Sequence, residues 1–149
     1  MTIYKHIAKK KLYHSGYSIF VGDIYYTNEF GLLHRNNGPA LIRSGAYQPW
    51  EIWFKEGVIH RISGPAYIES DIKNWYLNGD QITDESSPED KWKLIKGNLE
   101  NIFAFRNPSF EVQEYVIIHR PDLINQIPNL DPKLKEKYSY EMNLSGIDI

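Results

Sequence analysis

Residues 31–40 read GLLHRNNGPA, and residues 57–66 read GVIHRISGPA. Six positions are identical at a constant offset of 26 residues, which chance alone does not explain. The repeated residues are Gly31, His34, Arg35, Gly38, Pro39 and Ala40 in the first copy, and Gly57, His60, Arg61, Gly64, Pro65 and Ala66 in the second. An internal repeat therefore organises this part of the chain.

An aromatic pair precedes the first glycine of each copy, and a third pair extends the pattern. The pairs are Tyr25-Tyr26, Trp53-Phe54 and Trp75-Tyr76, the last of which leads to Gly79. No His-Arg or Gly-Pro-Ala follows Gly79. A degenerate final copy is typical of a capping repeat, so we place the repeats at about 23–38, 39–64 and 65–82.

The residues of one copy predict two short strands and two turns. The β-formers at the aromatic positions suit a half-buried strand, and Asn78-Gly79 is a strong two-residue hairpin signal. Residues 55–57 form a looser version of the same turn, and each His-Arg segment is then expected as the returning strand. Gly-Pro ends that strand, because glycine permits positive φ and proline fixes the exit. The sequence therefore predicts an antiparallel β-meander.

The unit Trp-Tyr-x-x-Gly-x-x-His-Arg-x-x-Gly-Pro-Ala resembles repeats of small proteins encoded by bacteriophages and other large DNA viruses. Those repeats are similar to a divergent MORN repeat, a hairpin unit that stacks into an elongated sheet. The resemblance covers about residues 23–82. It implies a β-meander and a viral or prophage origin, and it implies no activity.

Past residue 83 the pattern changes to helical starts. Ser87-Pro88, Asn107-Pro108 and Asp131-Pro132 each combine a capping residue with proline in the first turn. Residues 107–113 (NPSFEVQ) are also similar to helical Asn-Pro-Ser-x-Glu-Val-Gln repeats of phage and viral proteins. We therefore expect an α+β protein, with a β-repeat subdomain at 1–83, a helical subdomain at 84–140 and a frayed tail at 141–149.

The His-Arg pairs support two interpretations. In the structural one, His and Arg hydrogen-bond the carbonyls of the adjacent Gly-Pro-Ala turn and stack on the aromatic pair. In the functional one, stacking brings His34 near His60 on one face and Arg35 near Arg61 on the other, because neighbouring strand residues face opposite ways. Paired arginines bind phosphate or carboxylate, and paired histidines bind a metal or perform acid–base catalysis. We favour the structural interpretation, because these residues recur together with the turn.

The tryptophans also carry two interpretations. In the functional one, Trp50, Trp53 and Trp75 form a stacking surface for a base or a peptide. In the structural one, which we favour, Trp53 and Trp75 occupy repeated positions and lie in the core between repeats. Trp50 lies outside the repeat register beside Pro49, so we predict that it is an exposed anchor. The lysines at 5, 9, 10 and 11 form a small basic cluster, which we interpret as protection of an edge strand rather than a nucleic-acid site.

Composition excludes several classes of protein. The chain has 149 residues, a net charge of −2 and no cysteine, which excludes thiol chemistry and cysteine-bound zinc and argues against a general nucleic-acid binder. No apolar run is long enough for a membrane span or a secretion signal, so we expect a cytoplasmic protein. No catalytic, metal-binding or cofactor motif is identified.

The repeat surfaces predict a non-enzymatic binding protein, and the resemblance to phage repeats implies a phage-encoded accessory protein that binds a host or defence protein and changes its activity. The expected contact residues are Arg35, Arg61, Trp50, His34 and His60. One alternative is a small-ligand or nucleotide-binding protein that sequesters its ligand with the stacked arginines and aromatics. A second alternative is a hydrolase that uses the histidine pair.

Overall fold

The computed structural model describes the backbone of residues 2–45 and 48–144, and the side chains as far as residue 139. It confirms the α+β class: antiparallel strands occupy residues 3–81, and helices follow from residue 88. The chain divides into two compact units, Met1–Ile82 and Thr83–Ile149, and each is described by itself.

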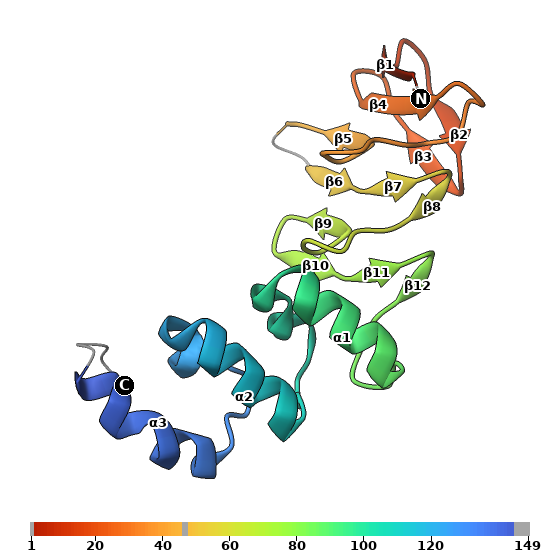
Figure 1. Ribbon diagram of the computed structural model, residues 1–149. Helices are drawn as coiled ribbons and strands as arrows, with labels where there is room; N and C mark the ends of the chain where they lie inside the picture. Colours follow the sequence, from red (N-terminus) through yellow and green to blue (C-terminus); the bar gives the residue numbers. More distant parts are fainter. Residues whose placement is uncertain (1, 46–47, 145–149) are drawn as a thin grey trace. The chain divides into compact units, whose positions relative to one another are not determined.

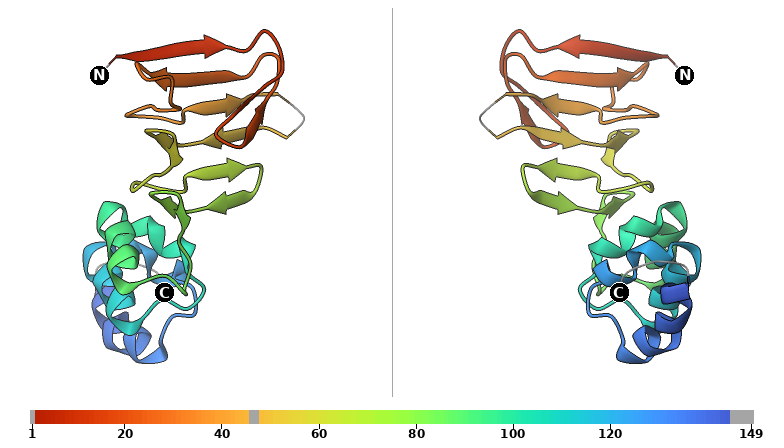
Figure 2. Two further views of the ribbon diagram at one scale, coloured as in Figure 1. Left: turned by 90° about the vertical axis from the view of Figure 1, so that its right-hand side faces the viewer. Right: turned by 90° about the vertical axis from the view of Figure 1, so that its left-hand side faces the viewer.

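The first unit is built on a six-stranded antiparallel sheet. Figure 1 labels the strands, and Figure 2 shows them lying side by side like rungs. Their order is β1 (Ile3–Ile7), β4 (Ile24–Asn28), β5 (Leu41–Arg43), β6 (Trp50–Ile52), β9 (Tyr67–Glu69) and β10 (Ile72–Asn74). The connection expected at residues 45–49 joins β5 to β6, and residues 46–47 lie outside the described residues.

Three two-stranded hairpins accompany the sheet. They are β2 (Leu12–His14) with β3 (Tyr17–Ile19), β7 (Phe54–Lys55) with β8 (Val58–Ile59), and β11 (Tyr76–Leu77) with β12 (Asp80–Gln81). Each hairpin turn has two residues of positive φ: 52° and 84° at Ser15-Gly16, 48° and 83° at Glu56-Gly57, and 50° and 88° at Asn78-Gly79. These values fit the turn geometry that two-residue hairpins prefer, so both predicted hairpins are confirmed.

The same backbone hydrogen bond recurs after each aromatic residue. The amide of His34 donates to the carbonyl of Tyr26, that of His60 to Trp53, and that of Ile82 to Trp75, at 2.8–3.0 Å. Ile82 therefore takes the place of the histidine in the third copy, and its side chain is buried. An apolar side chain thus stands where the first two copies have a histidine.

The core of the first unit lies on one face of the sheet. Leu41 and Ile52 are opposite each other in the register and fully buried, and the alternation of strand residues sends their neighbours to the other face. The buried cluster comprises Ala8, Ile19, Leu33, Ala40, Leu41, Ile52, Phe54, Ile59 and Ala66. The small alanines of the two Gly-Pro-Ala motifs are part of it.

The second unit repeats an α-helix followed by a 3-10 helix. Its elements are α1 (Pro88–Gly97), η1 (Leu99–Ala104), α2 (Phe110–His119), η2 (Pro121–Gln126) and α3 (Pro132–Leu144). The α-helices begin at residues 88, 110 and 132, so successive starts lie 22 residues apart. Apolar side chains at matching positions fill the core, including Leu94 and Val116, and Ile102 and Ile124.

Two boundaries in this unit differ from the expectation. α2 does not begin at Asn107-Pro108, because Ser109 is the N-cap and its Oγ accepts the amide of Val112 at 3.3 Å. Pro108 lies before the helix, where its carbonyl accepts Nε2 of Gln113 at 2.8 Å. α3 continues through Leu144, which is inside the segment expected as a tail, and residues 145–149 lie outside the described residues.

Candidate functional site

The two repeat arginines make the same contacts in both copies. Nη1 of Arg35 donates to the carbonyl of Pro39 at 3.1 Å, and Nη1 of Arg61 donates to that of Pro65 at 3.0 Å. Each guanidinium also lies over an aromatic ring of its own copy, 4.1 Å from the centroid of Tyr26 and 3.8 Å from that of Trp53. The arginines thus close the Gly-Pro-Ala turn and stack as the structural interpretation expects.

The close approach of the guanidinium explains the repeated glycine. A Cβ placed on Gly38 would lie 2.8 Å from Cζ of Arg35, and one on Gly64 would lie 2.8 Å from Cζ of Arg61. Burial lowers the pKa of the Arg61 guanidinium, and the charge of Glu51 opposes that effect. Glycine, proline and arginine therefore form one interlocked turn in each copy.

The histidines connect successive copies instead of closing their own turn. Nδ1 of His34 accepts the amide of Glu56 at 2.9 Å, and Nδ1 of His60 accepts the amide of Asn78 at 2.9 Å. Both donors lie in the hairpin turn of the next copy. The sequence assigned these imidazoles to the Gly-Pro-Ala carbonyls, which is wrong because the bond is made to the following repeat.

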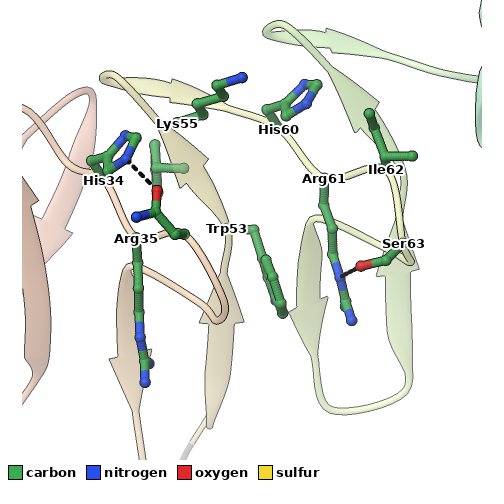
Figure 3. A pocket seen from close by; sticks show the side chains of 10 residues that line it. His34, Arg35, Trp53, Lys55, His60, Arg61, Ile62 and Ser63 are labelled. Carbon is green, nitrogen blue, oxygen red and sulfur yellow. Dashed lines mark hydrogen bonds between the residues drawn. The ribbon is translucent and has the colours of Figure 1, made fainter. Parts of the chain in front are cut away.

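The His-Arg segments are not strands either. β8 ends at Ile59, and His60 and Arg61 follow it in the connection to the Gly-Pro-Ala turn. Figure 3 nevertheless shows the imidazoles of His34 and His60 at one end of a groove, while the side chains of Arg35 and Arg61 extend toward the other end. The four side chains are brought together along this groove without sharing one contact point.

The groove has a volume of about 330 Å³ and runs between the first and second copies. Its wall includes the four repeat side chains and is completed by Asn36, Trp53, Phe54, Lys55, Ile62 and Ser63. Figure 3 shows Trp53 between Arg35 and Arg61. No carboxylate lines the groove, so its charge is positive.

The protein itself engages the whole imidazole ring of His34. Nε2 of His34 pairs with Oδ1 of Asn36 at 2.9 Å, so both ring nitrogens of this buried residue are occupied. Among the side chains that the structure describes, no group of three His, Asp or Glu residues could hold a metal ion. Each repeat histidine thus accepts a backbone amide of the following hairpin turn.

Trp50 differs from the exposed anchor that its sequence position predicted. It lies on β6, is half-buried, and packs against the core with its ring edge-on to Tyr17. The guanidinium of Arg43 covers the ring at 4.0 Å from its centroid. A second groove of about 310 Å³ passes beside Trp50.

Arg43 belongs to a buried cluster that the sequence did not reveal. Its guanidinium pairs with Asp23 at 2.8 Å, and the two side chains are 13% and 4% exposed. Cζ of Arg43 also lies over the ring of Phe20, 4.2 Å from its centroid. The two partners are 20 residues apart and outside the repeated motif, so no local sequence pattern predicts their contact.

Sequence reasoning also missed the β2–β3 hairpin, although Ser15-Gly16 between two tyrosines could have indicated it.

The sheet face opposite the core carries a row of isoleucines. Strand pairing aligns one residue of each strand in a line across the sheet: Ile7, Ile24, Ile42, Glu51, Ile68 and Lys73. Ile7 is 61% exposed, and the other three isoleucines are partly exposed. We name these four isoleucines the isoleucine row. The predicted lysine cluster borders it, with Lys5 on the edge strand β1 and the lysines at 9–11 exposed beyond that strand.

Comparisons with other proteins supply no relative from which a role could be transferred. No protein-family model, curated protein or solved structure matches this chain. Among the described residues, no helix combines the length and apolar character that crossing a membrane requires.

Proposed function

We propose that this protein is a non-enzymatic binding protein whose repeat sheet docks a protein partner. The resemblance of its repeats supports the further proposal that it is phage-encoded and modulates a host or defence protein. The observation that carries the binding proposal is the isoleucine row, which lies on the side of the sheet away from the core. Aligned apolar side chains that remain accessible on a surface are typical of protein interaction sites.

The composition of this face also indicates the chemistry of the partner. Glu51 lies within the line of isoleucines, between Ile42 and Ile68, and Lys73 lies at its end. Both charged residues are exposed. An apolar partner surface bordered by complementary charges fits this arrangement, because the apolar centre supplies affinity and the charges set the register. The repeat arginines contribute less, since their guanidinium groups already hold the Gly-Pro-Ala turns.

The test compares two isoleucines of similar exposure on opposite faces. Ile7 belongs to the row and is 61% exposed, while Ile72 lies on β10 in line with Trp50 and Glu69 and is 55% exposed. Tagged wild type, Ile7→Glu and Ile72→Glu are used to capture proteins from nuclease-treated bacterial lysate. Circular dichroism and melting temperature first establish that all three are folded alike.

We expect wild type and Ile72→Glu to retain one partner in stoichiometric amount and Ile7→Glu to lose it. The interaction is then measured with the purified partner by calorimetry. Retention of the partner by Ile7→Glu, or capture of none by wild type, contradicts the proposal.

A further inference from the structure

The groove between the first two copies has features that the isoleucine row lacks. It is lined by Arg35, Lys55 and Arg61 and by no carboxylate. Lys55 is exposed and forms no hydrogen bond or ion pair with any described side chain, whereas both arginines are already engaged. The ammonium group of Lys55 is therefore available to an anion.

Trp53 supplies a flat apolar wall in the same groove. Arg61 covers one face of its ring at 3.8 Å, and Figure 3 shows Arg35 on the other side. The indole Nε1 of Trp53 is buried and has no hydrogen-bond partner among the described residues. An unpaired buried donor is costly, so a ligand acceptor that reached Nε1 would gain a hydrogen bond that the protein itself does not supply.

The two ends of the groove differ in chemistry. Figure 3 shows Lys55 at the end that holds His34 and His60, while Trp53 and the arginines extend toward the other end. A ligand that complements both ends carries an anionic group at one end and a planar ring at the other. Planar rings stack on tryptophan and on guanidinium groups, and phosphates pair with lysine.

We propose that this groove binds a nucleoside monophosphate, with the base beside Trp53 and the phosphate at Lys55. The volume of about 330 Å³ lies at the lower end of the range for small-molecule sites and is large enough for one mononucleotide. None of the four isoleucines of the row lines the groove, so this site is separate from the one that carries the proposed partner.

The experiment is calorimetric titration of the full chain with AMP, with adenosine and with inorganic phosphate. Two variants change the groove, Lys55→Gln and Ile62→Glu. Each has a matched control outside it: Lys73→Gln removes another exposed lysine of the first unit, and Val58→Glu changes a side chain that is 44% exposed, as Ile62 is. Circular dichroism verifies that every variant keeps the native fold.

We expect AMP to bind at one site, and adenosine or phosphate alone to bind more weakly. Lys55→Gln removes a charge-assisted hydrogen bond, so AMP affinity is expected to fall at least about tenfold while that for adenosine stays unchanged. Ile62→Glu weakens AMP binding by repulsion, and neither control changes it. Absence of saturable heat with AMP at about 1 mM, or equal weakening by Lys73→Gln, overturns the proposal. The proposed docking of a protein partner rests on the isoleucine row and not on this groove. Either of these two results therefore leaves the partner proposal standing.

Discussion

Both units of this chain are built from repeats, but the features that recur between copies differ: residue identities in the first unit, and residue types in the helical unit. In the first unit, six residues recur identically in a ten-residue window, whereas the recurrence in the helical unit is mainly at cap positions and apolar positions. The contacts explain the difference. The arginine donates to the prolyl carbonyl and covers the aromatic ring at the same time, and a Cβ on the glycine would meet its guanidinium. A helix core accepts Leu94 in one copy and Val116 in the next, because apolar packing is tolerant of side-chain identity.

The largest expected effect is the loss of a repeat arginine. Arg61→Ala removes the bond to Pro65 and the stacking on Trp53, so we expect the free energy of unfolding to fall by about 3 kcal/mol. Arg106→Ala changes an exposed arginine of the helical unit and is expected to cost no more than about 0.5 kcal/mol. Urea unfolding measures the loss of unfolding free energy in both variants. Equal losses would contradict the view that the first unit depends on the identity of its arginine and the helical unit does not.

The histidines test the link between copies. His34→Ala removes both hydrogen bonds of a buried side chain and is expected to cost about 2 kcal/mol, against about 1 kcal/mol for the more exposed His60→Ala. Amide hydrogen exchange gives a local measure of each bond. Exchange at Glu56 should accelerate in His34→Ala and exchange at Asn78 in His60→Ala, and a uniform acceleration in both variants would argue against separate links.

A glycine substitution sharpens the argument about interlocked turns. Gly64→Ala forces the guanidinium of Arg61 aside, and we expect a loss of about 1–2 kcal/mol. In an Arg61→Ala background the clash is absent, so the same substitution should cost much less. Gly57→Ala is the control: its strain comes from a φ of 83°, which the arginine substitution cannot relieve. Additivity at Gly64 and Arg61 in a double-mutant cycle would contradict the interlocked turn.

The serine caps of two copies of the helical unit are expected to stabilise the protein equally. Ser87 caps α1 and Ser109 caps α2, each by accepting an amide of the first turn. Ser87→Ala and Ser109→Ala should each destabilise the protein by about 1 kcal/mol, because each leaves one amide without its acceptor. Thermal unfolding measures both changes. A neutral Ser109→Ala would mean that α2 does not start where the structure places it.

The smallest effect concerns acid stability. Hydrogen bonds from Lys137 and Tyr138 lower the pKa of Glu114 below its ordinary value of 4.5. The stabilisation by Glu114 is therefore complete above that value and lost as the pH falls through the lowered pKa. Glu114→Gln should flatten the acid limb of the melting-temperature profile slightly, whereas Glu111→Gln on the same helix should leave it unchanged. An NMR titration of Glu114 that shows no lowering would contradict this.

Local signals predicted much of the fold. Gly79 after Asn78 specified a hairpin turn, and Pro88 after Ser87 specified a helix start, because these residues set backbone geometry by themselves. The second helix start was misplaced by two residues, since Asn107-Pro108 and Ser109 offer competing caps. The fit between the arginine and its turn was also predictable, because the groups involved lie close together in the chain.

The sequence by itself determined the α+β class, the repeated turn and the arginine that closes it, since these depend on residues close together in the chain. Only the tertiary structure decided where the histidines bind, that Trp50 packs against the core, and that Asp23 meets Arg43. The isoleucine row likewise exists only through strand register, which joins residues as distant as Ile7 and Ile68. Register and burial are properties of the assembled sheet, so no local pattern could reveal them.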